Sequence, residues 1–106
     1  MGVSILITAY KEPLTVAHAL EALRVDDTYI QEILLICPDE ETRRAGFEVK
    51  GWEEKLRWIQ DEGKGKPSAL NKAVREMKGD IAVCTDGDVW IEPGSIGPLL
   101  APLEEE

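Results

Sequence analysis

The sequence predicts an α/β fold in which a mostly parallel, open sheet of about four strands carries helices on both faces. Four runs of strand length alternate along the chain with segments of helical periodicity. The connections between them are short, and this β-α-β-α-β-α-β order is typical of a doubly wound parallel sheet. The chain has 106 residues, so we expect a single domain over residues 1–106.

The four predicted strands cover residues 3–8, 32–37, 56–60 and 81–85. Three of them are near-continuous apolar runs, as expected of strands buried on both faces of a parallel sheet. Cys37 and Cys84 lie at the ends of two runs, where cysteine usually acts as a small buried hydrophobe, and we expect two buried free thiols. Residues 46–55 fit neither a helix nor a strand clearly.

The first helix is predicted over residues 13–25, because Pro13 suits a first helical turn and apolar residues follow at helical spacing. His18 lies off this apolar stripe and is expected to face the solvent. The second helix begins at residues 39–41, where acidic side chains interact favourably with a helix N-terminus.

The third helix is expected to open at residue 67 or 68. Its apolar stripe comprises Leu70, Val74 and Met77. An Asp-Gly-Asp turn follows the last strand, and residues 89–91 then form a short extended piece. A last helix begins near Pro93.

The composition excludes several partners and sites. With 12 basic and 21 acidic residues, the net charge is −9. A field of that sign repels nucleic acid and anionic membranes, so we expect neither as a partner. No His/Cys cluster indicates zinc. The N-terminus lacks the basic region of a signal peptide and no apolar run has membrane-spanning length, so we expect a cytoplasmic protein.

Polar residues follow each predicted strand. In an open parallel sheet, ligands bind at the carboxyl ends of the strands, and these residues should converge on one edge. They are Tyr10, Glu12, Asp39, Lys64, Lys66, Asp86 and Asp88. Tyr10 could stack on a nucleotide base and Glu12 could accept a ribose hydroxyl, although both are also common loop residues. Trp90 could lie next to such a site.

Asp86 and Asp88 lie two residues apart in a glycine-centred turn. Carboxylates are hard oxygen ligands for Mg²⁺ or Mn²⁺, and one Asp could bind the ion while the other holds a water or a sugar hydroxyl. Gly87 would let the backbone turn tightly and a ligand approach. Because Asp and Gly favour turns in any case, the tripeptide alone indicates a simple turn more than a metal site.

Lys64 and Lys66 flank Gly65 just before a predicted helix N-terminus, which attracts phosphate groups. Both lysines could stabilise a departing diphosphate. The match to a P-loop is poor, because Gln60 stands in place of its first Gly and Pro67 follows Lys66. A solvated basic loop is the alternative.

With these segments in place, the chain resembles the family 2 glycosyltransferases of the GT-A fold. Residues 3–12 (VSILITAYKE) resemble the opening strand and "PAYNE" turn of that family, and residues 32–39 (EILLICPD) its second strand. Residues 65–71 (GKPSALN) resemble its "GKxxALN" segment, and residues 79–88 (GDIAVCTDGD) the strand that ends in its DxD motif. No segment is specific alone, but four in this order favour a metal site over a simple turn.

The resemblance implies a Rossmann-like N-terminal half of a GT-A fold that binds a nucleoside-diphosphate-sugar donor for glycosyl transfer. The residues it implies for nucleotide-sugar binding are Ala9, Tyr10, Glu12, Asp39, Lys66 and Asp86. It implies that Asp86 and Asp88 bind the metal, Mg²⁺ or Mn²⁺, which would offset charge on the leaving diphosphate.

The chain also departs from the family. Thr8 and Lys11 replace a frequent Pro and Asn, which changes the stiffness of the turn but not its backbone contacts. Cys37 stands where a base-reading Asp is common, and Asp39 would substitute for it. Family members continue well past the DxD motif, into a half that supplies the acceptor site and usually the general base. We therefore expect a truncated domain with no identified catalytic residue, which a partner chain or a dimer could complete.

Four hypotheses for the function stay open at this point. The chain could be a truncated glycosyltransferase domain or a non-catalytic nucleotide-binding module. It could be a phosphotransferase of the haloacid dehalogenase type, because residues 86–89 after a strand also resemble that nucleophile motif, although there the motif lies on an early strand. It could also be a small α/β domain without catalysis.

Overall fold

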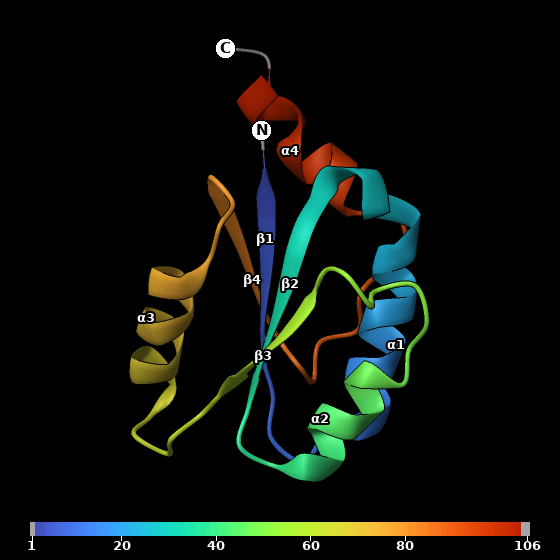
Figure 1. Cartoon of the computed structure of the whole chain (residues 1–106). Helices are drawn as coiled ribbons and strands as arrows, with labels where there is room; N and C mark the ends of the chain where they lie inside the picture. The colour runs from blue at the N-terminus through green and yellow to red at the C-terminus, as the bar shows by residue number, and fades with distance from the viewer. Residues whose placement is uncertain (1, 105–106) are drawn as a thin grey trace.

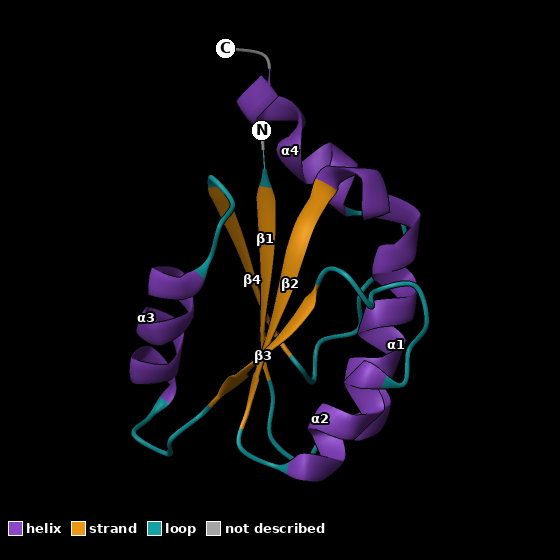
Figure 2. Cartoon of the chain, in the orientation of Figure 1, coloured by secondary structure: helices purple, strands orange, loops and turns teal. Residues whose placement is uncertain are grey.

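The computed structural model describes residues 2–104, with side chains described as far as residue 101. The elements alternate along the chain (Figures 1 and 2). They are β1 (Val3–Thr8), α1 (Pro13–Leu23), the 3₁₀ helix η1 (Arg24–Tyr29), β2 (Ile30–Cys37), α2 (Glu40–Phe47), β3 (Leu56–Gln60), α3 (Lys66–Glu76), β4 (Ile81–Asp86) and α4 (Ile96–Glu104).

The four strands form one sheet in the order β3-β2-β1-β4, and every pair of neighbours is parallel. Helix α3 lies on one face, whereas α1, α2 and α4 lie on the other (Figure 1). The predicted fold class is thus confirmed. The predicted strands agree with the observed ones to within two residues at each end.

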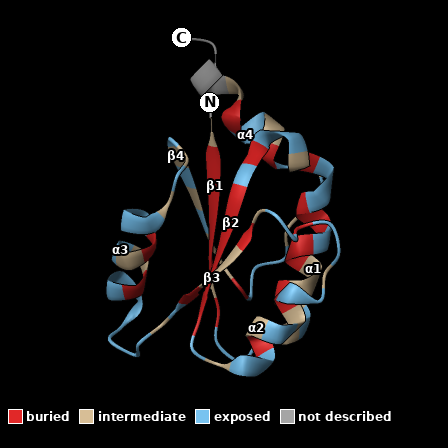
Figure 3. Ribbon diagram, in the orientation of Figure 1, coloured by how far each residue is buried: buried red, intermediate tan, exposed pale blue. Residues whose placement is uncertain are grey.

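The core is densest around β1 and β2, which lie in the middle of the sheet and are covered on both faces (Figure 3). Ile5, Ile7 and Leu35 face α1 and α4, and Leu6 and Leu34 face α3. Burial of an aliphatic side chain of this size contributes about 1.5–3 kcal/mol. These two strands therefore form a rigid base from which the loops at their carboxyl ends project.

The ambiguous segment 46–55 contributes a core residue although it forms neither helix nor strand over most of its length. Trp52 is 1% exposed and packs in the larger core cluster. Its indole Nε1 donates a hydrogen bond to the Leu20 carbonyl oxygen at 2.9 Å, so the polar atom of this buried ring is satisfied.

Two details of burial differ from the prediction. In α3, Leu70 and Met77 of the predicted stripe pack against the core, but Val74 is 48% exposed, and the fully buried residues are Ala69 and Ala73. These two small residues form the central contact between the helix and the sheet. Cys84 is exposed rather than buried, because α3 packs over β1 and β2 and leaves this face of the edge strand β4 uncovered.

The segment after the Asp-Gly-Asp turn also differs from the prediction. Residues 89–91 form a bend and coil rather than an extended strand. Trp90 stacks on His18 of α1, with the ring centroids 3.4 Å apart and the planes at 18°. His18 is therefore half-buried under an aromatic ring rather than facing the solvent.

Candidate functional site

The site lies at the point in the sheet where the order of successive strands reverses. From β1 the chain proceeds outward to β2 and β3, and it then crosses to the opposite side of β1 to form β4. In open parallel sheets, ligands bind at this topological switch point, beyond the carboxyl ends of the strands. Here those ends are Thr8 of β1 and Asp86 of β4, which are direct register partners.

A cleft of about 640 Å³ opens at this point. That volume is within the usual range for a small-molecule site. It is lined by Thr8, Ala9, Tyr10, Glu12, Pro38, Asp61, Gly63, Gly65, Lys66, Ala69, Asp86 and Asp88. Most of the residues predicted for the site line this cleft, and the two exceptions are Asp39 and Lys64.

Asp86 is the most heavily engaged carboxylate of the cleft. Its Oδ1 accepts a hydrogen bond from Thr8 Oγ1 at 3.0 Å, and the same oxygen forms an ion pair with Lys66 Nζ. The hydrogen bond from Lys66, with a further one from Thr8, lowers the pKa of Asp86 below its usual value. Asp86 is therefore ionised at neutral pH.

The Asp-Gly-Asp turn packs tightly against β1. The Gly87 backbone N–H donates to the Thr8 carbonyl oxygen at 2.6 Å. A Cβ atom on Gly87 would lie 2.6 Å from Ala9 Cβ, which is closer than carbon atoms pack. Gly87 is thus required for the turn to approach the end of β1 this closely. The same packing fixes Asp88, which is exposed, at the rim of the cleft.

The two lysines of the basic loop have different surroundings. Lys66 lines the cleft and contacts Asp86. Lys64 lies outside the lining and is paired with Glu62, with Nζ 3.7 Å from Oε2. Gly65 between them has φ +98°, a backbone conformation that glycine adopts without strain. Only one of the two predicted lysines therefore faces the site.

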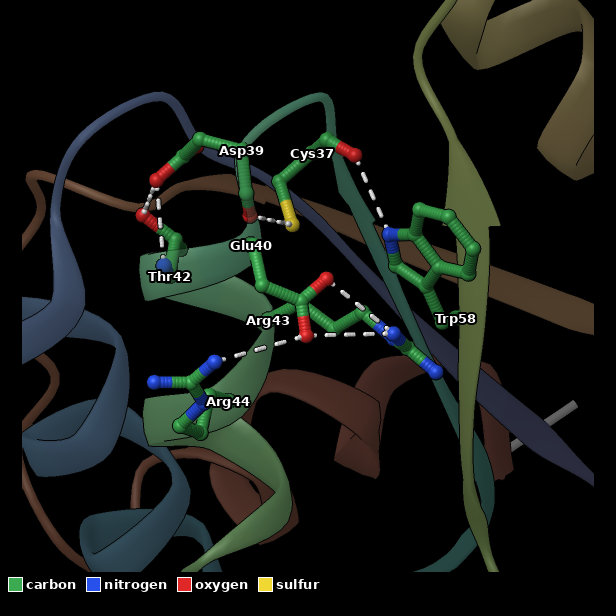
Figure 4. A network of polar contacts seen from close by, with 7 residues as sticks. All are labelled: Cys37, Asp39, Glu40, Thr42, Arg43, Arg44 and Trp58. Carbon is green, nitrogen blue, oxygen red and sulfur yellow. Dashed lines mark hydrogen bonds and ion pairs between the residues drawn. The ribbon is translucent and has the colours of Figure 1, made fainter.

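Asp39 holds the loop after β1 instead of lining the cleft. It is the N-cap of α2, where its Oδ2 accepts from the Thr42 backbone N–H at 3.0 Å and from the Thr42 hydroxyl (Figure 4). Its Oδ1 accepts from the Lys11 backbone N–H at 3.1 Å. Thr42 Oγ1 in turn accepts from the Glu12 backbone N–H at 2.9 Å. These contacts fasten the loop that carries Tyr10 to the start of α2.

Opposing effects act on the Asp39 carboxyl. Burial raises its pKa, but the hydrogen bonds from Thr42 and Lys11 outweigh burial and hold the pKa below its usual value. The carboxylate is therefore charged, and both of its oxygens already accept hydrogen bonds within the protein. A direct contact between Asp39 and a nucleotide base stays a prediction, to which this geometry gives no support.

Cys37 occupies the position where the resemblance leads one to expect an acidic residue. It is fully buried beneath the loop, and its backbone carbonyl accepts from Trp58 Nε1 at 3.0 Å (Figure 4). Burial, with the nearby Asp39 charge, raises the pKa of the Cys37 thiol to about 11. The thiol is protonated and lies outside the cleft lining.

Asp61 and Thr8 are cleft residues that the sequence analysis did not select. Asp61 follows β3 directly, and its Oδ1 accepts from the Gly63 backbone N–H at 2.8 Å, which shapes the basic loop. The rule that polar residues after parallel strands converge would have identified it. From the sequence, Thr8 is only a departure from the family pattern, because its hydroxyl contact with Asp86 depends on strand register.

The carboxylates fit a divalent cation only in part. Among the side chains that the structure describes, those of residues 2–101, no cluster of three or more His, Cys, Asp or Glu forms a ready-made metal site. Asp86 and Asp88 could supply two oxygen ligands from the cleft. Mg²⁺ is commonly held by one or two carboxylates, with water and substrate phosphates completing its shell, so this donor set fits an ion that binds together with a phosphate ligand.

The fold and cleft define a doubly wound α/β domain with its candidate site at the switch point. Residues 4–106 match Glycosyl transferase family 2, and the chain belongs to this family. The family match favours this assignment over the haloacid dehalogenase alternative. No curated protein has a significant sequence match to the chain.

Solved structures share the fold at low sequence identity. One is glucosyl-3-phosphoglycerate synthase from Mycobacterium tuberculosis in complex with Mn²⁺, uridine diphosphate and phosphoglyceric acid, with a TM-score of 0.77 and 19% identity over 95% of this chain and 38% of that one. A mycobacterial protein has a TM-score of 0.80 and 19% identity over 98% and 37%. CMP:2-keto-3-deoxy-manno-octonic acid synthetase complexed with CTP has a TM-score of 0.75 and 20% identity over 100% and 48%.

The chain therefore spans less than half the length of these neighbours. In the part of the chain that the structure describes, no helix is long and apolar enough to cross a membrane. A cytoplasmic location stays a prediction.

Proposed function

We propose that this chain is the donor-binding part of a glycosyltransferase, which binds a nucleoside-diphosphate sugar together with Mg²⁺ or Mn²⁺. The observation that carries the proposal is the convergence of residues from three separate segments on one cleft. Tyr10 and Glu12 come from the loop after β1, Lys66 from the start of α3, and Asp86 and Asp88 from the end of β4 and the turn that follows it.

The residues at the β1 end of the cleft have environments that suit binding of the nucleoside. Tyr10 is 58% exposed at the cleft and can stack on a base. Glu12 Oε1 accepts from the Tyr10 backbone N–H at 3.1 Å and so fixes the turn that presents the ring. Ala9 is small and buried at the cleft wall, where its backbone N–H donates to the Ile36 carbonyl oxygen at 3.0 Å.

The remaining residues suit the diphosphate end of the donor. Lys66 supplies a positive charge to a chain whose net charge is −9. Asp86 and Asp88 would hold the divalent ion, whose charge would offset the negative charge of the departing diphosphate. The family match supports glycosyl transfer, and the Mn²⁺ and uridine diphosphate in one structural neighbour support the type of ligand.

We further propose that polypeptide beyond the described domain supplies the acceptor site and the general base. The neighbours are more than twice as long as this chain, and we assign no base among the described residues. Among the described strands, β4 pairs with β1 alone, so its outer edge is available. A partner chain or a second copy could complete the sheet there.

Calorimetric titration with UDP and GDP, with and without Mn²⁺, tests the donor site. We expect binding of one nucleotide that depends on Mn²⁺ and is lost in Asp86→Asn. Asp80→Asn is the matched control, because Asp80 is exposed at the opposite end of β4. Nucleotide binding that does not depend on Mn²⁺, or that is retained in Asp86→Asn, would contradict the proposed site.

Turnover separates a catalytic domain from a binding module. A donor sugar and Mn²⁺ should yield little nucleoside diphosphate with this chain alone if the acceptor half lies elsewhere. Acceptor-dependent release at rates typical of enzymes, about 1–10³ s⁻¹, would show that the chain is catalytically complete.

A further inference from the structure

The ion pair between Lys66 and Asp86 lies where the proposed function requires a divalent cation. Lys66 Nζ and Thr8 Oγ1 both contact Asp86 Oδ1. One oxygen of this carboxylate is therefore occupied by two donors, and one of them carries a positive charge. Any cation that binds Asp86 meets an ammonium group that is already in place.

A lysine ammonium and a divalent cation compete for one carboxylate. Each is attracted by its negative charge, and at a separation of a few ångströms they repel each other. A third acidic side chain could relieve this repulsion, but the described residues hold no cluster of three potential ligands around Asp86. The cation must therefore bind against the charge of Lys66 or displace it.

Lys66 is free to move away from Asp86. Its side chain is 54% exposed, and an ammonium on a flexible four-carbon stem reorients easily. The residue also lines the cleft beside Gly65, so a Lys66 that leaves Asp86 stays within reach of a ligand there. The lysine thus has a second position available without any rearrangement of the sheet.

We propose that Lys66 serves as an internal counter-ion for Asp86 in the free protein and is exchanged for a divalent cation when the donor diphosphate enters. The diphosphate offers Lys66 a new anionic partner at the moment when the cation takes Asp86. Cation and diphosphate then strengthen each other's binding, and the cation alone binds weakly. This inference rests on the proposed function, because it requires a diphosphate in the cleft.

Binding of Mn²⁺ alone, followed by calorimetry or by the electron paramagnetic resonance of the free ion, tests the exchange without turnover. Lys66→Met removes the ammonium and should bind Mn²⁺ alone about ten-fold more tightly than the wild type. Saturating UDP or GDP should then strengthen Mn²⁺ binding less in this variant than in the wild type. Lys66→Arg retains the charge and should resemble the wild type, and Lys66→Gln provides a second neutral variant if Lys66→Met unfolds.

Lys64→Met is the matched control, because it removes one positive charge from the same loop but not from Asp86. Its affinity for Mn²⁺ should stay within about two-fold of the wild type, since exposed charges are screened over distance. If Lys66→Met binds Mn²⁺ no more tightly than Lys64→Met, while the wild type binds UDP or GDP with Mn²⁺ through Asp86, the exchange is overturned and the proposed function stands. If no variant binds Mn²⁺ with or without either nucleotide, both proposals fail.

Discussion

Thr8 and Asp86 end neighbouring strands as register partners, and a hydrogen bond of 3.0 Å joins Thr8 Oγ1 to Asp86 Oδ1. The link connects the first strand with the last strand of the described sheet. It orients the carboxylate that we propose for the cation, and it exists only because a hydroxyl stands at position 8. Proline, the residue that the family 2 glycosyltransferase pattern leads one to expect at position 8, could not donate this hydrogen bond.

Replacement of Thr8 by valine should therefore weaken the site while keeping its shape. A lost hydrogen bond of about 1 kcal/mol corresponds to about five-fold weaker Mn²⁺-dependent UDP or GDP binding in a calorimetric titration. Thr28→Val is the control, because Thr28 is exposed in η1. Unchanged affinity in Thr8→Val, in a protein where Asp86→Asn abolishes binding, would show that Thr8 does not orient Asp86.

Replacement of Gly87 by alanine should destabilise the turn. The new methyl group would overlap Ala9 Cβ and lie 3.2 Å from the Thr8 carbonyl oxygen, and overpacking of this kind costs about 1–3 kcal/mol. Urea unfolding measures the loss. Gly97→Ala is the control, because its methyl group would make only ordinary contacts with the Tyr29 ring. The double variant with Ala9→Gly should recover part of the stability, and no recovery would refute the clash.

Glu32 should make the stability of the domain dependent on acidic pH. Burial raises the pKa of Glu32, but hydrogen bonds from the Lys78 backbone N–H, Ser4 Oγ and Arg57 outweigh burial and hold the pKa below its usual value. The unfolded chain therefore binds the proton more readily than the folded protein. The stabilisation is complete above the unfolded pKa of about 4.3 and is lost as the pH falls through the lower folded pKa.

Glu32→Gln isolates this contribution. We expect a loss of about 2 kcal/mol at pH 7, because the partly buried Arg57 loses the closer of its two carboxylate partners and keeps only the longer contact with Glu76. The difference from the wild type should shrink between about pH 5 and pH 3, as measured by urea unfolding at each pH. Glu54→Gln, at an exposed position, should show little difference. A wild-type advantage that is constant over this pH range would contradict the assignment.

The two thiols should differ sharply in reactivity. The pKa of Cys37 is raised to about 11 and its side chain is buried, so little reactive thiolate forms at pH 8. Cys84 is exposed on β4. Ellman's reagent should therefore modify one thiol rapidly in the native protein and two after denaturation. Cys84→Ser should abolish the rapid reaction, and a rapid reaction that persists in this variant would place Cys37 at the surface.

Asp39 illustrates why part of the site could not be predicted. Its position after β2 correctly indicated a residue at the carboxyl edge of the sheet. Whether it faces a ligand or the protein depends on the distance to Lys11 and Thr42, and the contact with Lys11 spans 28 residues of sequence. The predicted burial of Cys84 was wrong for a similar reason, because the sequence pattern of a strand does not show that α3 leaves one edge of the sheet uncovered.

The sequence by itself determined the order of the elements, the parallel sheet and the family. These follow from apolar periodicity, from short connections and from local motifs such as the Asp-Gly-Asp turn, all of which are properties of neighbouring residues. Only the tertiary structure decided which polar groups meet. Lys66 contacts Asp86 across 20 residues and Thr8 contacts it across 78, because strand order and register place these segments together.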